Sequence, residues 1–120
     1  MGYHFFWCTK YRKPILTGEI QDDLKLILND ISSQNNFSIE QMEVMEDHVH
    51  LFITATPNDL ITNIIKKFKG VSARLLFKKH PTIQKELYGG HLWNPSYYVG
   101  TVGSISEDTI RKYIDNQKKG

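Results

Sequence analysis

The sequence is poor in cysteine, in long apolar runs and in net charge. Its single cysteine, Cys8, cannot form an internal disulfide or a zinc site built from several cysteines, so we expect a reducing, cytoplasmic setting. No run approaches the roughly 20 apolar residues that cross a bilayer, and the apolar run at residues 5–8 is too short for a secretory signal. We therefore expect neither a disulfide scaffold nor a membrane partner.

The formal net charge is only +2, so the total charge does not by itself indicate a nucleic-acid partner. The distribution of the basic residues is more informative, because many of them are clustered beside aromatic residues. Basic side chains can neutralise phosphates while neighbouring rings stack on unpaired bases. The alternative is that these residues form ordinary solvated helix faces. The clusters lie at residues 10–13, 66–74, 78–80 and 111–119.

A length of 120 residues and a hydrophobic content of 40% suit one modest core, so we predict a single domain, residues 1–120. Apolar residues recur at helical spacing in some segments and alternate as in strands in others. The predicted order is β-α-β-β-α-β-α, with strands at 3–9, 37–45, 48–54 and 93–102 and helices at 19–35, 58–79 and 106–118. This pattern is typical of an α+β fold, with a ferredoxin-like (RRM-like) antiparallel four-stranded sheet and helices on one face.

Finer expectations concern the ends and the interiors of these elements. Asn58 is a suitable N-cap for the helix at 58–79, and Gly70 is expected to loosen the middle of that helix. In the strand at 37–45, strict alternation places Ile39 and Gln41 on the same side of the sheet.

The strand at 48–54 carries two histidines separated by one residue. Strand alternation turns Val49 toward the core and places His48 and His50 on the other face of the sheet. Their Cα atoms are then about 6.5–7 Å apart, so both imidazoles can bind one metal ion. The alternative is that two surface histidines happen to alternate with core residues. We interpret as structural or surface residues the histidines that lack this spacing: His4, His80 and His91. For His4, the alternative is a position near the site.

On the last predicted helix, Tyr113 and Gln117 lie four residues apart on the inward face. An inward glutamine needs a partner, because an unpaired buried amide costs about 1–3 kcal/mol. A tyrosine hydroxyl is a poor nucleophile near neutral pH and needs activation. A divalent cation held by His48, His50 and an amide oxygen can polarise a scissile phosphate and orient it toward the phenol. Mixed imidazole and oxygen ligands suit magnesium or manganese in such a role.

Four motifs occur along the chain and together indicate a family. A lone His-x-His is a weak signal, but one followed about sixty residues later by Tyr-x-x-x-Gln on a terminal helix is specific. The motifs are Trp-Cys-Thr-Lys-Tyr-Arg at 7–12, His-Val-His at 48–50, Ser-Tyr-Tyr-Val-Gly-Thr-Val-Gly at 96–103 and Tyr-Ile-Asp-Asn-Gln at 113–117. In these motifs and their order, the chain resembles the TnpA-type single-tyrosine HUH transposases of small bacterial and archaeal insertion sequences.

The resemblance implies a reaction and a set of partners. Tyr113 would be the nucleophile that forms a 5′-phosphotyrosine and frees a 3′-hydroxyl. His48, His50 and Gln117 would hold the metal, magnesium or manganese. The substrate would be single-stranded DNA with hairpins, and the protein would be a homodimer in which the tyrosine helix can complete the active site of the other subunit.

The resemblance also suggests roles for two glycines and for several basic residues. Gly100 and Gly103 are candidate hinges for the tyrosine helix, because glycine tolerates changed backbone angles, although they can equally serve as turn residues. Phosphate contacts require only charge and reach. The candidate DNA-binding residues after the first strand and on the second long helix are Lys10, Arg12, Lys66, Lys67, Lys69, Ser72 and Arg74.

Three other interpretations stay open. The same α+β topology, with aromatic residues on the open face of the sheet, binds single-stranded RNA by stacking. Such a binding module does not explain the paired histidines. A replication initiator or relaxase would share the tyrosine chemistry but is usually a larger protein. An inactive copy of a transposase would bind hairpins without moving an element.

Overall fold

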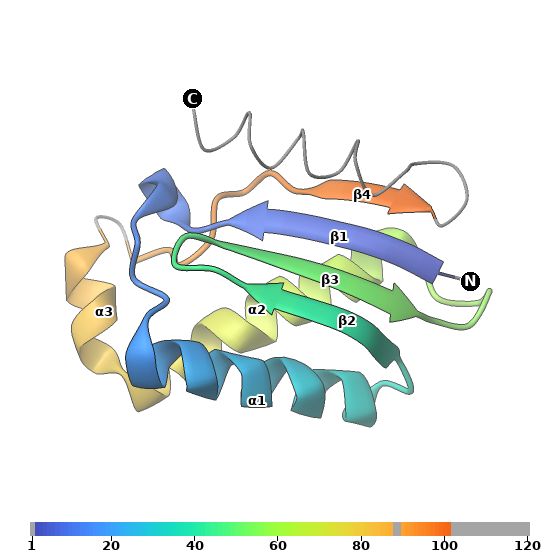
Figure 1. Ribbon diagram of the computed structural model, residues 1–120, viewed down its shortest axis with the longest axis horizontal. Coiled ribbons are helices and arrows are strands. Elements are labelled where there is room, and N and C mark those ends of the chain that lie inside the picture. The colour runs from blue at the N-terminus through green and yellow to red at the C-terminus, as the bar shows by residue number, and fades with distance from the viewer. Residues whose placement is uncertain (1, 88–89, 102–120) are drawn as a thin grey trace.

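Within the described residues, the strands and the two long helices follow one another in the order β-α-β-β-α-β, with one short helix added before the last strand. The structure is a computed structural model that describes residues 2–87 and 90–101 (Figure 1). Its elements are β1 (Gly2–Cys8), the 3-10 turn η1 (Lys10–Arg12), α1 (Gly18–Gln34), β2 (Ser38–Val44), β3 (His48–Thr54), α2 (Ile61–Lys79), α3 (Pro81–Glu86) and β4 (Tyr98–Thr101). The helix predicted at 106–118 lies outside the described residues.

The four strands form one antiparallel sheet in the order β2-β3-β1-β4 (Figure 1). Because β1 and β2 are each antiparallel to β3 between them, β1 and β2 run in the same direction on either side of it. This is the split βαβ arrangement of the ferredoxin-like class. The predicted fold class, an α+β fold with a four-stranded antiparallel sheet, is therefore confirmed.

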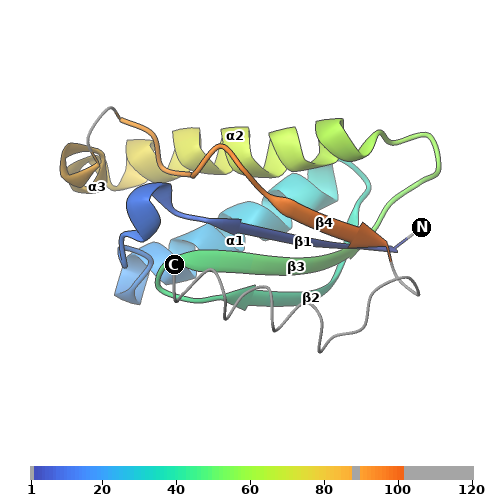
Figure 2. The same ribbon diagram turned by 90° about the horizontal axis from the view of Figure 1, so that it is seen from above.

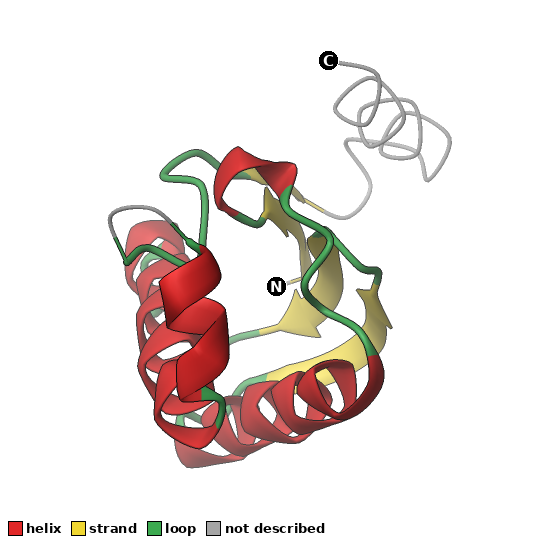
Figure 3. Ribbon diagram, turned by 90° about the vertical axis from the view of Figure 1, so that its left-hand side faces the viewer, coloured by secondary structure: helices red, strands yellow, loops and turns green. Residues whose placement is uncertain are grey.

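The long helices α1 and α2 lie together on one face of the sheet (Figures 2 and 3). Alternating side chains of β1 and β3 pack against them in one apolar core. The β1 and β3 residues of this core are Tyr3, Phe5, Trp7, Val49, Leu51 and Ile53. The alternation predicted for β3 is thus confirmed on its inward side, and the opposite side is left for other chemistry. None of the helices in the described part of the chain is long and apolar enough to cross a membrane.

Helix α1 is held by its apolar stripe and ended by a left-handed residue. Leu24, Leu28 and Ile31 recur at helical spacing and are buried against the sheet. The chain leaves the helix through Asn36, whose φ of 58° is one that asparagine tolerates better than most residues. The Ser32 hydroxyl then donates to the carbonyl of Phe37 at 2.6 Å, which leads the chain directly into β2.

The start of α2 differs from the prediction. The helix begins at Ile61 with Leu60 as its N-cap, so the prediction of a cap at Asn58 is wrong. The preceding residues form a turn of their own, in which the carboxylate of Asp59 accepts hydrogen bonds from the backbone N–H and the hydroxyl of Thr56. The helix also continues through Gly70 without interruption, so the expected loosening of its middle is wrong as well.

Strand β2 contains an irregularity that changes which residues face the core. Its pairing with β3 shifts between Ile39 and Gln41, so that Ile39 lies opposite Ile53 while Gln41 lies opposite Phe52. An extra residue in one strand reverses the alternation beyond it. Ile39 faces the core and Gln41 is exposed, which corrects the prediction that they share a face.

The last described strand is shorter than predicted. The region expected to be a strand at 93–102 pairs as a strand only over Tyr98–Thr101, although Trp93 forms an isolated bridge with Thr9. The Asn94 side-chain oxygen accepts hydrogen bonds from the backbone N–H and the hydroxyl of Ser96 at 3.0 Å, which bends the chain. Pro95, which lies inside this bend, has no N–H to give to a sheet.

Candidate active site

His48 and His50 lie on the face of β3 that is turned away from α1 and α2. Their neighbours across β1 are Cys8, opposite His48, and Phe6, opposite His50. Cross-strand partners share a face of the sheet, so all four side chains belong to one surface. His48 is only 2% exposed, and His50 is half-buried. His48 is therefore not a surface histidine that merely alternates with core residues.

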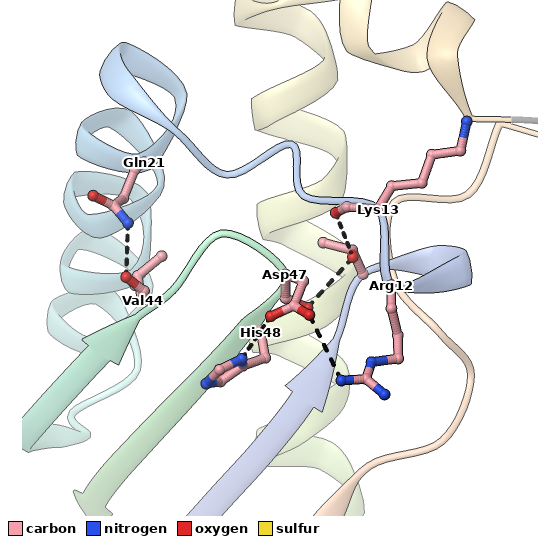
Figure 4. A network of polar contacts seen from close by, with 7 residues as sticks. Arg12, Lys13, Gln21, Val44, Asp47 and His48 are labelled. Atoms are coloured by element: carbon pink, nitrogen blue, oxygen red, sulfur yellow. Dashed lines mark hydrogen bonds and ion pairs between the residues drawn. The ribbon is translucent and has the colours of Figure 1, made fainter. Parts of the chain in front are cut away.

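A carboxylate fixes the orientation of His48. The Nδ1 atom of His48 lies 2.8 Å from Oδ1 of Asp47, and the other ring nitrogen points away from this contact (Figure 4). When Nδ1–H donates to a carboxylate, the lone pair of the imidazole is on Nε2, which is the arrangement found in many metal-binding histidines. The sequence-based prediction of the site did not include Asp47. The missed signal is an acidic residue directly before a candidate histidine ligand.

Asp47 is in turn held by the segment that follows β1. Its Oδ2 atom lies 3.8 Å from the Arg12 guanidinium (Figure 4). The backbone N–H of Thr9 donates to the carbonyl of Asp47 at 2.9 Å, and the hydroxyl of Thr9 donates to the carbonyl of Lys13 at 2.8 Å. The motifs at residues 7–12 and 48–50 are thus joined through Asp47 in one network at the end of β1. Arg12, predicted to bind DNA, faces this network.

His4 belongs to the same surface, which is the alternative that the sequence left open for this histidine. Its Nδ1 atom lies 3.2 Å from Nε2 of His50, and its ring stacks on Phe52 with centroids 4.7 Å apart. The interpretation of His4 as a structural or surface residue missed this contact. The available signal was the alternation of β1, which places His4 and Phe6 on the face opposite Tyr3 and Phe5.

Aromatic and apolar side chains enclose His48. The ring of Phe6 packs against it at a centroid distance of 5.2 Å. Cys8, directly opposite on β1, is buried, and burial raises the pKa of its thiol above the ordinary value. The imidazoles of His48 and His50 are the candidate metal-binding groups of this surface.

The described residues contain no complete cluster of metal-binding side chains. Within residues 2–87 and 90–101, no group of three His, Cys, Asp or Glu side chains is arranged to hold a metal ion. His48 and His50 are brought onto one surface, and His4 touches His50. Tyr113 and Gln117, the predicted nucleophile and third ligand, lie outside the described residues, as does Gly103. Gly100 lies in β4 opposite His4 and is buried.

The predicted DNA-binding residues of α2 fall into two groups. Lys66, Lys67 and Arg74 are exposed. Ser72 is 0% exposed, and its hydroxyl accepts a hydrogen bond from the indole N–H of Trp93 at 3.0 Å. The enclosed side chain of Ser72 fixes Trp93 against the helix and is not among the α2 side chains that reach solvent, and its contact with DNA stays a prediction.

Lys69 holds a loop rather than projecting into solvent. Its ammonium group donates to the backbone carbonyls of Asn94 at 2.7 Å and Ser96 at 3.3 Å. Burial lowers the pKa of Lys69 below its ordinary value. The side chain lines a groove of about 430 Å³ between α2 and the chain before β4, together with Lys66 and Tyr97. Lys69 thus positions one wall of a basic and aromatic groove.

Sequence comparison gives the family. Residues 1–117 match the family described as IS200-like transposases. The chain is 49% identical over 117 residues to the ISDra2 transposase TnpA of Deinococcus radiodurans, covering 98% of this chain and 84% of that protein. It is also 26% identical over 121 residues to the transposase of insertion sequence IS200 from Salmonella typhimurium, covering 98% and 80%.

Solved structures agree in fold. A crystal structure of a candidate transposase from Deinococcus radiodurans R1 superposes with a TM-score of 0.88 at 45% identity, covering 98% of this chain and 90% of that one. A REP-associated tyrosine transposase bound to a REP hairpin superposes with a TM-score of 0.63 at 18% identity, covering 99% and 68%, a likeness that concerns the fold alone. The chain belongs to the family of IS200-like transposases.

Proposed function

We propose that this transposase cleaves and rejoins single-stranded DNA at the hairpin-flanked ends of its element, through a 5′-phosphotyrosine at Tyr113 and with help from a divalent metal. The observation that carries the proposal is the pair of histidines on one surface of β3, with His48 oriented by Asp47. An imidazole held in this way is prepared to bind a cation rather than to pack in a core.

The donor atoms of this surface fit a divalent cation. His48 would bind through Nε2, because its Nδ1 is engaged by Asp47. Nε2 of His50 is in contact with His4, so His50 would bind through Nδ1, or through Nε2 after releasing His4. The amide oxygen of Gln117 would be the third ligand. When bound, magnesium or manganese supplies Lewis-acid polarisation of the scissile phosphate.

The chain's own residues carry out the bond changes. The phenolic oxygen of Tyr113 loses its proton and attacks the phosphorus, and the 3′-oxygen leaves and takes up a proton. The products are a 5′-phosphotyrosine and a free 3′-hydroxyl. In the rejoining step, the 3′-hydroxyl of another strand attacks the same phosphorus and releases Tyr113, so no external energy source is needed.

Contact with DNA is proposed for the exposed basic residues. Lys66, Lys67 and Arg74 project from α2, and Lys66 borders the groove that Lys69 and Tyr97 also line. Positive charge beside an aromatic ring suits a nucleic-acid strand. The structural neighbour was solved with a hairpin bound, which supports a hairpin as the ligand of this chain.

We also propose that the protein acts as a homodimer with shared active sites, in which Gly100 and Gly103 act as hinges of the tyrosine helix. Membership of the family supports this part of the proposal. Mixing His48→Ala with Tyr113→Phe gives a direct test, since each variant lacks a different catalytic group. Recovered cleavage in the mixture indicates that the two groups can come from different subunits, whereas two inactive variants that stay inactive together indicate a site within one chain.

The reaction itself is tested with labelled hairpin DNA from the flanks of the gene. The purified protein is incubated with this DNA and magnesium or manganese, and products are separated on denaturing gels for wild type, Tyr113→Phe and His48→Ala. A covalent adduct in wild type alone, mapped by mass spectrometry to Tyr113, is the expected result. Binding without an adduct under every metal would overturn the proposal and favour a nucleic-acid-binding module.

A further inference from the structure

The turn after β1 holds two bulky residues in an uncommon backbone conformation. Tyr11 and Arg12 have φ values of 56° and 53°. This left-handed region is rarely adopted by residues with large side chains, because the Cβ atom crowds the backbone carbonyl. Glycine or asparagine would fit this position with less strain. A tyrosine here is therefore unfavourable for folding and calls for a different explanation.

Surrounding hydrogen bonds keep this turn in place. The backbone N–H of Lys10 donates to the carbonyl of Leu92 at 2.8 Å, and that of Arg12 donates to the carbonyl of Thr9 at 2.9 Å. The Thr9 hydroxyl closes the turn by its bond to Lys13. The direction in which Tyr11 leaves the backbone is thus fixed by its neighbours and not by packing of its own ring.

The ring of Tyr11 is presented to solvent. Tyr11 is 62% exposed, and it is the one aromatic residue among the exposed large hydrophobic side chains of residues 2–87 and 90–101. The ammonium group of Lys10 lies 5.3 Å from the ring centroid. Such a contact places positive charge beside an accessible aromatic surface.

The position of Tyr11 connects it to the candidate active site. The next residue, Arg12, lies 3.8 Å from Asp47, which orients His48. Cys8, at the end of β1, is the cross-strand neighbour of His48. The turn that presents Tyr11 therefore lies beside the residues that orient and adjoin His48.

We propose that Tyr11 is a stacking platform for one unpaired base next to the scissile phosphate, with Lys10 at the neighbouring phosphate. This inference rests on the proposed action on single-stranded DNA. A tyrosine face stacks on any base, and it can do so only where the base is not already stacked in a duplex. The platform would thus favour single-stranded flanks over paired DNA without selecting a sequence.

The test compares three variants by DNA affinity in EDTA, so that cleavage does not interfere. Tyr11→Gly removes the ring and suits the positive φ, Tyr11→Phe keeps the ring, and Leu60→Ala removes an exposed apolar side chain at the start of α2 as a control. The probe is a fluorescent hairpin with an unpaired flank, compared with the same hairpin without the flank. Affinity of Tyr11→Gly for the flanked probe is expected to fall about 5- to 100-fold. Tyr11→Phe and Leu60→Ala are expected to bind like wild type.

Two further measurements distinguish loss of stacking from other causes of weaker DNA binding. The melting temperature of Tyr11→Gly is expected to equal or exceed that of wild type, so weaker binding cannot be attributed to unfolding. In a second measurement, each flank base is replaced in turn by an abasic site. One of these replacements should weaken the binding of the wild-type protein, and the same replacement should leave the affinity of Tyr11→Gly unchanged. Equal affinity of Tyr11→Gly and wild type for the flanked probe would overturn the platform. A wild type that binds the flanked probe but forms no Tyr113 adduct with metal contradicts the proposed reaction and leaves the platform intact.

Discussion

The two faces of the sheet are built from alternating residues of the same strands, yet they have different chemistry. Toward α1 and α2, Val49, Leu51 and Ile53 are each 0% exposed and make only apolar contacts in the core. On the other face, His48 and His50 contact carboxylate, imidazole and aromatic groups. One strand thus supplies stability through one set of residues and chemistry through the next. Substitutions at neighbouring positions should therefore have separate consequences.

The largest expected effect is on catalysis. His50→Ala should abolish the metal-dependent adduct while the protein remains folded, because His50 is half-buried and lies outside the core. Gel analysis of labelled hairpin DNA measures the adduct, and circular dichroism measures the fold. If His50→Ala forms the adduct at the wild-type rate, the assignment of the catalytic chemistry to the face opposite the helices is contradicted.

The next effect is on stability. Leu51→Ala, one residue further along β3, should lower the free energy of unfolding by about 2–5 kcal/mol, because it leaves a cavity in the core. Urea titration at low temperature provides the measurement, and the folded fraction should still form the adduct. The milder Ile53→Val should cost about 0.5–1.5 kcal/mol by the same mechanism. An unchanged urea midpoint for both variants would contradict the assignment of this face to the core.

A smaller effect is expected from the carboxylate behind His48. Asp47→Asn should weaken Mn²⁺ binding about 10- to 100-fold, because the orienting acceptor of the imidazole N–H is weakened. Isothermal titration calorimetry measures the affinity. Asp22→Asn, at an exposed position of α1, removes the same charge elsewhere and should bind Mn²⁺ like wild type. Equal losses in both variants would indicate a general charge effect rather than orientation of His48.

The smallest expected effect is on the pH dependence of stability, through a hydrogen-bonded carboxylate of α1. Hydrogen bonds from His80 at 2.6 Å and from Lys79 at 3.0 Å lower the pKa of Asp23 below its ordinary value of 3.8. A lowered folded-state pKa adds stability above 3.8 that disappears as the pH falls through the folded value. Asp23→Asn should therefore lower the urea midpoint near neutral pH and converge with wild type in acid, while DNA cleavage at neutral pH stays unchanged. A constant difference across the whole pH range would argue against this linkage.

Much of this architecture follows from the sequence, because the spacing of apolar residues along a helix or strand reflects which of its sides is buried. The strand predicted at 48–54 coincides with β3. The helix predicted at 19–35 from its apolar stripe matches α1 to within one residue at each end. Two of the errors in element boundaries arise where side chains form hydrogen bonds with nearby backbone. Asp59 and Asn94 form local turns that move the start of α2 and of β4, and α3 was missed although Pro81 marks its first turn.

The candidate site was only partly predictable for a related reason. Spacing within one strand places His48 and His50 together, but it contains no information on contacts between strands. The approach of His4 to His50 depends on the register of β1 with β3, and the burial of Ser72 depends on the distant Trp93. The roles of Tyr113 and Gln117 stay predictions.

The central claim is that the face opposite the helices holds a divalent metal through His48 and His50. Pulsed electron paramagnetic resonance of the Mn²⁺-loaded protein detects nitrogen nuclei bound to the ion. We expect couplings from two histidine nitrogens in wild type and one fewer in His48→Ala and in His50→Ala. His91→Ala, which changes an exposed histidine outside this surface, should give the wild-type couplings. Wild-type nitrogen couplings in both His48→Ala and His50→Ala would contradict metal binding through these two histidines.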